Sequence, residues 1–175
     1  MQQEGRRSAG PAKTDPLFDR NGSTQATNAG ATADPREMLR TVFGHAAFRG
    51  QQEAVVDQVV AGGDAVVLFP TGAGKSVCYQ IPSLCRPGVG IVVSPLIALM
   101  HDQVEGLRQA GVNAASLNSS MSDEERDTVR ADLLAGRLDL LYVTPERIVS
   151  EGFRRTLSRV RIALFAIDEA HCVSA

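Results

Sequence analysis

Five short apolar runs, separated by segments of helical character, restrict this chain of 175 residues to few folds. The runs are 65–69, 90–93, 112–117, 138–143 and 162–167. Short continuous runs rich in Val, Ile and Leu are typical of parallel strands that are covered by helices on both faces. Strands and helices that alternate with short connections, and that cross over with a right-handed sense, predict a doubly wound α/β domain with a mostly parallel sheet.

Helix start signals lie between these runs. Asp34–Pro35 and Ser94–Pro95 each place an N-cap residue before a proline, and Ser122 with Glu125 has the spacing of a capping box. A glycine follows several of the segments, which is typical of a helix end. The predicted helices span about 35–43, 51–61, 95–110 and 122–135, and a further helix is expected after residue 76.

The first part of the chain differs in composition from the rest. Residues 1–33 are rich in Gly, Ala, Ser, Thr, Asn and Gln, carry few large apolar side chains and show no periodicity. Such a segment cannot bury enough apolar surface to offset the entropy lost on ordering. We therefore expect a disordered N-terminal tail over 1–33 and one partial α/β domain over 34–175.

Charge and cysteine content exclude several classes of protein. The net charge is −2, so any nucleic-acid site must be local. Three cysteines without a C-x-x-C pair argue against a disulfide framework and against a self-contained zinc site. No apolar run approaches the length of about 20 residues that spans a bilayer, and no secretory signal is present. We expect no membrane association, and an intracellular location that is cytoplasmic (nucleoid) or nuclear.

A glycine-rich segment, PTGAGKS at 70–76, follows the first predicted strand and opens a helix. Its glycines allow successive backbone N–H groups to face one centre, and the helix N-terminus adds further donors for an anion. Lys75 would carry its charge to the β- and γ-phosphates of ATP, and the Ser76 hydroxyl would bind Mg²⁺. The alternative is a strand-to-helix turn with an incidental lysine. The predicted nucleotide-binding residues are Thr71, Gly72, Ala73, Gly74, Lys75 and Ser76.

A second polar motif, Asp168-Glu169-Ala170-His171, follows the last predicted strand directly. Ligands of open α/β sheets collect at the carboxyl ends of the strands, so these side chains should face the same crevice as the phosphate loop. Asp168 would hold Mg²⁺, and Glu169 would orient or deprotonate the attacking water. His171 could couple the nucleotide to other parts of the protein. By itself the motif could be a solvated helix start, but a phosphate loop upstream favours an ATP-hydrolysing site.

Several motifs in this order resemble RecQ-family DNA helicases over roughly residues 36–174. They are FGHAAFRGQQ (43–52), PTGAGKS, CYQIP (78–82), SPLIALMHDQV (94–104), YVTPER (142–147) and DEAHCVS (168–174). The resemblance implies an enzyme that hydrolyses ATP and unwinds DNA while moving 3′ to 5′ along one strand. It also implies a motor of two RecA-like lobes with ATP between them, of which this chain is the first part of the first lobe.

The same resemblance implies roles for residues outside the two nucleotide motifs. Arg49 and Gln52 would contact adenine, with His45 beside the base, because a Gln amide can both donate to and accept from the adenine edge. The alternative for Gln52 is an exposed position at a helix start. Ser94 and Thr144 would donate to the phosphates of single-stranded or duplex DNA, or they could be simple N-caps before the prolines that follow them.

The chain also departs from the family pattern. Phe69 stands where the general phosphate loop has glycine, although the variant PTGxGKS is typical of helicase superfamily two. His45 replaces a Tyr or Leu, and Ala73 replaces a common Gly. The chain ends at Ala175, where the family continues with an aromatic-rich loop, and then with a second lobe and its arginine finger. We expect an isolated half-site of this kind to hydrolyse ATP very slowly, to be unable to unwind DNA and to expose an apolar sheet edge.

Three other functions compete with a DNA helicase. An RNA helicase of the same superfamily would share both nucleotide motifs, but the segment 43–52 and the CVS after DEAH argue against it. A non-catalytic nucleotide- or nucleic-acid-binding module is compatible with this chain, although Lys75, Asp168 and Glu169 are all present. A small-molecule kinase would share the phosphate loop without the DEAH motif.

Overall fold

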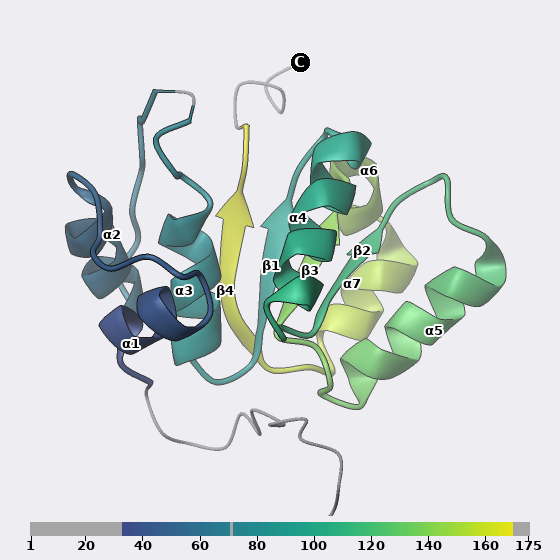
Figure 1. The fold of residues 1–175 in the computed structure, drawn as a ribbon. Coiled ribbons are helices and arrows are strands. Elements are labelled where there is room, and N and C mark those ends of the chain that lie inside the picture. The colour runs from purple at the N-terminus through teal and green to yellow at the C-terminus, as the bar shows by residue number, and fades with distance from the viewer. Residues whose placement is uncertain (1–32, 71, 170–175) are drawn as a thin grey trace, which may run out of the picture.

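A parallel sheet of four strands forms the centre of the computed structural model, which describes residues 33–70 and 72–169 (Figure 1). The strands are β1 (Val89–Val93), β2 (Ala114–Leu117), β3 (Leu140–Val143) and β4 (Ile162–Ile167), in the order β2-β3-β1-β4. Each pair of neighbours is parallel, and Ile91 of β1 lies opposite Leu141 of β3 and Phe165 of β4. The predicted parallel α/β architecture is therefore confirmed.

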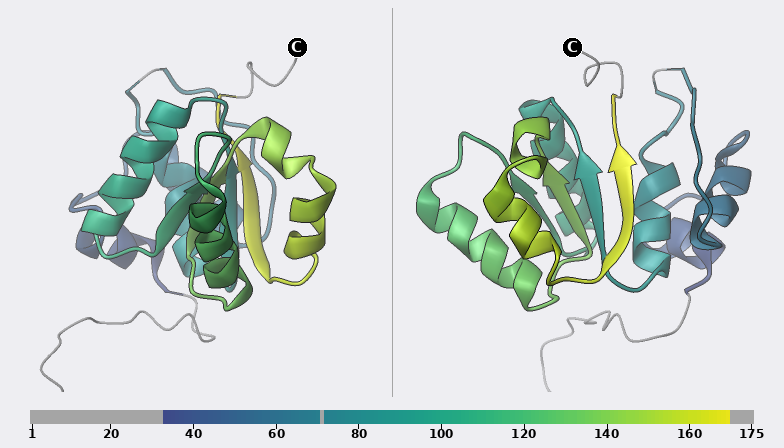
Figure 2. Two further views of the ribbon diagram at one scale, coloured as in Figure 1. Left: turned by 90° about the vertical axis from the view of Figure 1, so that its right-hand side faces the viewer. Right: turned by 180° about the vertical axis from the view of Figure 1, so that it is seen from behind.

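Helices cover both faces of this sheet, as the two further views show (Figure 2). Helices α5 and α7 pack with Ile91 and Leu141 on one face, whereas α4 packs with Val92 and Tyr142 on the other. The alternation along each strand separates these two apolar clusters. A third cluster joins α1, α2 and α3. The helices are α1 (Pro35–Thr41), α2 (Gln52–Val60), α3 (Val77–Cys85), α4 (Ile97–Gln109), α5 (Asp123–Leu134), α6 (Pro145–Ile148) and α7 (Glu151–Leu157).

Helix α3 lies unusually close to the sheet at Gly90 of β1. A Cβ atom on Gly90 would stand 2.0 Å from the Ser83 hydroxyl oxygen of α3, so only glycine fits at this point. The Ser83 hydroxyl itself donates to the Tyr79 carbonyl at 2.7 Å. This close approach places the helix that follows the phosphate loop directly against the central strand.

The strand predicted at 65–69 is not formed. Residues 64–70 have no regular secondary structure, and the side chains of Val66 and Leu68 are 92% exposed. The sheet ends at β4, where Phe165 and Ile167 are more than half exposed, and no described residue pairs with the outer side of that strand. Residues 65–69 do not pair their backbone groups with this open edge, so their apolar composition alone does not make them a strand.

The predicted helix starts are confirmed at two of three places. The Asp34 carboxylate accepts the Arg36 N–H at 2.9 Å, and Ser122 forms the predicted capping box with Glu125. The start predicted at Ser94–Pro95 is wrong, because α4 begins at Ile97 with Leu96 as its N-cap. Leu96 has extended backbone angles (φ −101°, ψ 96°), so the first helical turn starts two residues after Pro95.

Other predictions concern the chain ends, cysteines and membrane association. The predicted tail lies outside the described residues except for Ala33. Cys78 and Cys85 are buried free thiols, whereas Cys172 lies outside the described part of the chain. Within that part, no helix is both long enough and apolar enough to cross a bilayer.

Candidate nucleotide-binding site

The phosphate loop and the acidic motif meet at one cavity of about 320 Å³. Lys75 from the loop and Asp168 and Glu169 from the end of β4 supply its charged side chains. Its apolar wall comes from α2, from residues 65 and 67–69, from the start of α3 and from β4. Segments that lie about ninety residues apart in the chain therefore contribute opposite charges to one concave site, which is a common arrangement for ligand binding.

Lys75 and Glu169 face each other across this cavity. The Lys75 ammonium nitrogen lies 3.9 Å from a carboxylate oxygen of Glu169, and both side chains are about one-third exposed or less. Glu169 has a φ of 53°, in the left-handed region that non-glycine residues rarely adopt. Backbone strain of this kind tends to persist at functional sites, where the surrounding contacts fix the conformation.

Asp168 is held by three hydrogen bonds at the end of β4. Its N–H donates to the Val93 carbonyl at 2.9 Å, which continues the pairing with β1. Its carboxylate accepts the Glu169 N–H at 3.1 Å and the Tyr79 hydroxyl at 3.2 Å. Burial, together with the neighbouring Tyr142 and Asp168, raises the pKa of Tyr79, so the hydroxyl stays protonated and donates to the carboxylate.

The donor chemistry of this site fits Mg²⁺. The Ser76 hydroxyl, at the start of α3, and the Asp168 carboxylate are hard oxygen donors, and Mg²⁺ commonly takes one or two such protein ligands together with water and phosphate oxygens. No group of three or more His, Cys, Asp or Glu gathers among residues 33–70 and 72–169.

The phosphate loop turns through two glycines with positive φ angles. Gly72 has a φ of 81° and Gly74 a φ of 75°. A Cβ atom on Gly74 would lie 2.5 Å from the amide nitrogen of Gln52, so this position excludes a side chain for two separate reasons. Ala73, between them, donates its N–H to the Pro70 carbonyl at 3.1 Å.

Gln52 fastens the start of α2 to this loop. Its side chain is 4% exposed, its amide oxygen accepts the Arg49 N–H at 2.8 Å, and its amide nitrogen donates to the carbonyls of Ala73 and Gly74 at 3.0 and 3.1 Å. The expected alternative of an exposed glutamine does not hold, because all of its polar atoms bond to the protein. His45 and the Arg49 side chain are exposed, and neither lines the cavity.

Two predicted site residues, Thr71 and His171, lie outside the described residues. Sequence reasoning also missed two contributions to the site. One is the Tyr79 hydroxyl on Asp168, although Tyr79 belongs to the CYQIP segment that carried part of the family resemblance. The other is the attachment of Gln52 to the loop, which connects residues 21 and 22 positions apart.

The predicted nucleic-acid contacts Ser94 and Thr144 follow the neighbouring strands β1 and β3. Both are almost fully buried. The Thr144 hydroxyl lies near the Glu146 carboxyl and contributes to its lowered pKa. The two groups do not meet the geometry of a hydrogen bond, so the hydroxyl has no hydrogen-bond partner among the described residues. Thr144 is thus the N-cap of α6 by position alone, without a capping bond.

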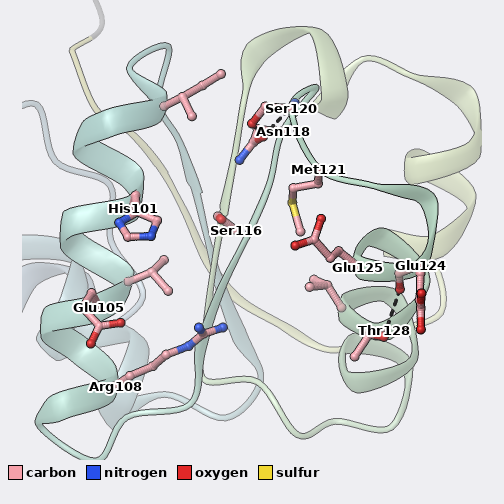
Figure 3. Close-up of a pocket in the computed structure, with 13 residues that line it drawn as sticks. His101, Glu105, Arg108, Ser116, Asn118, Ser120, Met121, Glu124, Glu125 and Thr128 are labelled. Atoms are coloured by element: carbon pink, nitrogen blue, oxygen red, sulfur yellow. Dashed lines mark hydrogen bonds between the residues drawn. The ribbon is translucent and has the colours of Figure 1, made fainter.

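A larger cavity, of about 590 Å³, lies between α4, α5 and the edge strand β2 (Figure 3). His101, Glu105 and Arg108 approach it from α4, and Asn118 and Ser120 from the loop after β2. The Arg108 side chain donates to the Ala114 carbonyl at 2.8 Å and so covers part of the open strand edge. Neither Lys75 nor the acidic motif lines this cavity.

Comparisons with known proteins identify the family of this chain. A family model described as DEAD/DEAH box helicase matches residues 49–175. The chain is 47% identical over 137 residues to an ATP-dependent DNA helicase RecQ from Haemophilus influenzae, a match covering 78% of this chain and 22% of that protein. It is also 47% identical over 147 residues to ATP-dependent DNA helicase Q5 from Mus musculus, covering 79% and 15%. The chain thus spans about a fifth or less of the length of these relatives.

One solved structure shares the fold. It is the crystal structure of a hypothetical ATP-dependent RNA helicase from Sulfolobus tokodaii, with a TM-score of 0.59 and 22% identity. The match covers 79% of this chain and 42% of that structure's chain. At this identity the likeness supports the architecture of the lobe.

Proposed function

Because the chain belongs to the DEAD/DEAH box helicase family, we propose that it is the ATP-binding part of the first motor lobe of a RecQ-type, ATP-dependent DNA helicase. The observation that carries the proposal is the single cavity in which Lys75 faces Asp168 and Glu169. A positive side chain for phosphate and two carboxylates for metal and water are the groups that phosphoryl transfer requires.

Each residue then has a defined role toward ATP. Lys75 moves from Glu169 to the β- and γ-phosphates, while the loop N–H groups and the N-terminus of α3 bind the phosphate oxygens. Glu169, released from Lys75, orients the attacking water or accepts its proton. Ser76 and Asp168 would hold Mg²⁺, which would supply positive charge beside the phosphates when bound.

The base of ATP lies near the segment that precedes the loop. His45 and Arg49 are exposed and can contact adenine without rearrangement of the core. Gln52 can contact adenine only by exchanging one of its internal hydrogen bonds, so we propose that adenine binding and the conformation of the loop are linked through this side chain.

Nucleic acid lies across the carboxyl ends of β1 and β3 in this proposal. The first turns of α4 and α6 offer backbone donors for a phosphate there, whereas the buried, unpartnered Thr144 hydroxyl becomes a donor only if nucleic acid opens this turn. Movement along DNA also needs the second lobe with its arginine finger, which we assign to the remaining length of the protein. We further propose a cytoplasmic (nucleoid) or nuclear location, where DNA is present.

ATP hydrolysis in the longest natural form of the protein tests this function. We expect Mg²⁺-dependent hydrolysis that rises with single-stranded DNA, and a fall of at least about 100-fold in the Lys75→Ala variant. Arg159→Ala, an exposed cation near the amino end of β4, is the matched control and should keep the wild-type rate.

The same assay separates the DNA helicase from its nearest alternative. The solved structure with the same fold is titled an RNA helicase, whereas the more similar relatives are named DNA helicases. Stimulation by RNA and not by DNA would replace the proposed substrate. Absence of hydrolysis in the longest form would reduce the function to nucleotide or nucleic-acid binding.

A further inference from the structure

Two neighbouring residues of α3, Tyr79 and Gln80, connect opposite parts of the lobe. The Tyr79 hydroxyl donates to a carboxylate oxygen of Asp168 at 3.2 Å. The Gln80 amide nitrogen donates to the amide oxygen of Gln103 at 2.8 Å and to the Tyr142 hydroxyl at 2.9 Å. One turn of helix therefore touches the acidic motif, helix α4 and strand β3.

The hydrogen bonds of Gln80 lie inside the protein and leave it little freedom. Gln80 is 4% exposed and Tyr142 is 1% exposed, so water cannot replace the bond between them, whereas Gln103 is half-buried. Both N–H groups of the Gln80 amide are in use, and the rings of Tyr79 and Tyr142 meet edge to face with centroids 6.5 Å apart. Displacing either partner of Gln80 would leave a buried polar group unpaired, so the partners must move together.

The two partners of Gln80 belong to the elements that lead to the proposed DNA contacts. Gln103 lies on α4, the helix that follows Ser94, and Tyr142 lies two residues before Thr144 on β3. The Tyr142 side chain is buried, and the amide oxygen of the half-buried Gln103 bonds inward to α3, so both make their contacts with Gln80 inside the protein. A shift of α4 or β3 would therefore reach α3 through these bonds.

We propose that Tyr79 and Gln80 are positioning residues that couple the DNA-facing ends of α4 and β3 to the carboxylate of Asp168. The inference rests on the proposed function, and it names a route by which DNA regulates the nucleotide site. Nucleic acid that moves α4 against β3 shifts Gln80, and the adjacent Tyr79 then reorients the carboxylate assigned to Mg²⁺. Coupling of this kind acts in both directions, so MgATP also adjusts the DNA-facing ends.

The test uses the longest natural form of the protein and measures the ratio of ATP hydrolysis rates with and without saturating single-stranded DNA. Gln103→Met removes the acceptor of Gln80, and we expect this ratio to fall about fivefold or more while the rate without DNA stays within about twofold. Gln103→Glu keeps an acceptor oxygen and should restore the ratio. Gln109→Met, an exposed glutamine of the same helix, is the matched control.

The hydrogen bond from Tyr79 to Asp168 is tested by a separate measurement. Tyr79→Phe removes only the hydroxyl that holds Asp168, and we expect the Mg²⁺ concentration for half-maximal hydrolysis to rise about fivefold. A purely structural role would lower the thermal midpoint and leave both the DNA ratio and the Mg²⁺ dependence unchanged. If Gln103→Met does not fold, Tyr142→Phe removes the other acceptor of Gln80 through loss of one oxygen atom and replaces it in the test.

The outcomes of these measurements are distinct. A stimulated wild type whose ratio is unchanged in Gln103→Met overturns the inference and leaves the proposed function standing. An equal fall in Gln109→Met also overturns it, because the effect would not follow the hydrogen bonds. A wild type that DNA does not stimulate defeats the proposed function, and this inference with it.

Discussion

Replacing Gly74 with alanine measures how tightly the phosphate loop is tied to α2. The new Cβ atom would stand 2.5 Å from the Gln52 amide nitrogen, and the φ of 75° is unfavourable for any residue with a side chain. The backbone conformation alone costs about 1 kcal/mol. Displacing the Gln52 amide loses its bonds to the Ala73 and Gly74 carbonyls, at about 1 kcal/mol each. We therefore expect Gly74→Ala to lower the free energy of unfolding by about 3 kcal/mol.

A double-mutant cycle separates the two contributions. In a Gln52→Ala background the displaced bonds are already absent, so Gly74→Ala should cost only the backbone contribution of about 1 kcal/mol. The double variant should then be about 2 kcal/mol more stable than the sum of the single variants predicts. The assay is urea-induced unfolding followed by far-UV circular dichroism, with a linear extrapolation to water at unchanged slope.

Gly111→Ala is the matched control for this cycle. Gly111 has a φ of 83°, and a Cβ atom added there would have no other atom within 4 Å, so only the backbone contribution should appear. Its effect should add to that of Gln52→Ala within about 0.5 kcal/mol. If Gly74→Ala and Gln52→Ala were also additive within that range, the contact between the two residues would carry no energy and the reasoning would be refuted.

Burial and helix capping lead to three further predictions. Leu68→Asn should change the free energy of unfolding of this chain by about 0.5 kcal/mol or less, because the side chain is 92% exposed; a loss above about 2 kcal/mol would show that residues 65–69 form a buried strand after all. Burial raises the pKa of the Cys78 and Cys85 thiols to about 11. In a Cys172→Ser variant, a disulfide reagent at pH 8 should therefore react with these thiols about 100-fold more slowly in the folded protein than in the protein unfolded in urea. Equal rates would contradict their burial. Ser122→Ala should lower the free energy of unfolding by about 1 kcal/mol. This loss should shrink as the pH falls through the lowered pKa of the Glu125 carboxyl, because the protonated carboxyl no longer completes the capping box. A loss that does not depend on pH would argue against the capping box.

The sequence alone was sufficient for most of the sheet. The apolar run 162–167 predicted β4 with its observed bounds, and the runs at 90–93, 112–117 and 138–143 predicted the other strands within two residues. These strands are buried on both faces or bounded by polar residues, so their apolar composition is sufficient to predict where they begin and end. The run 65–69 has a similar composition, yet Val66 and Leu68 are exposed and Val67 and Phe69 are only half-buried. Strand formation also depends on a neighbour elsewhere in the chain, which a local pattern does not contain.

The charged side chains of the candidate site could be predicted from the sequence, but the hydrogen bonds that hold them in place could not. Lys75, Asp168 and Glu169 follow from motifs in which residue type and spacing reflect the chemistry of phosphate and metal. Gln52 and Tyr79 contact the loop and the acidic motif through hydrogen bonds to residues 21 or more positions away. Such contacts depend on how α2, α3 and β4 pack, and no pattern within either segment encodes them.

The place of β4 at the edge of the sheet affects how the acidic motif can move. β1 has a strand on each side, whereas β4 is paired along β1 alone among the described strands. Backbone amides of β1 should therefore exchange with solvent only when most of the lobe unfolds, and those near the end of β4 through smaller local openings. Asp168 and Glu169 lie at the end of this less protected strand, so the carboxylates can shift while the central strands remain in place. The cavity thus joins helix α3, which packs closely on the central strand β1, to two carboxylates at the end of a strand that is held from one side.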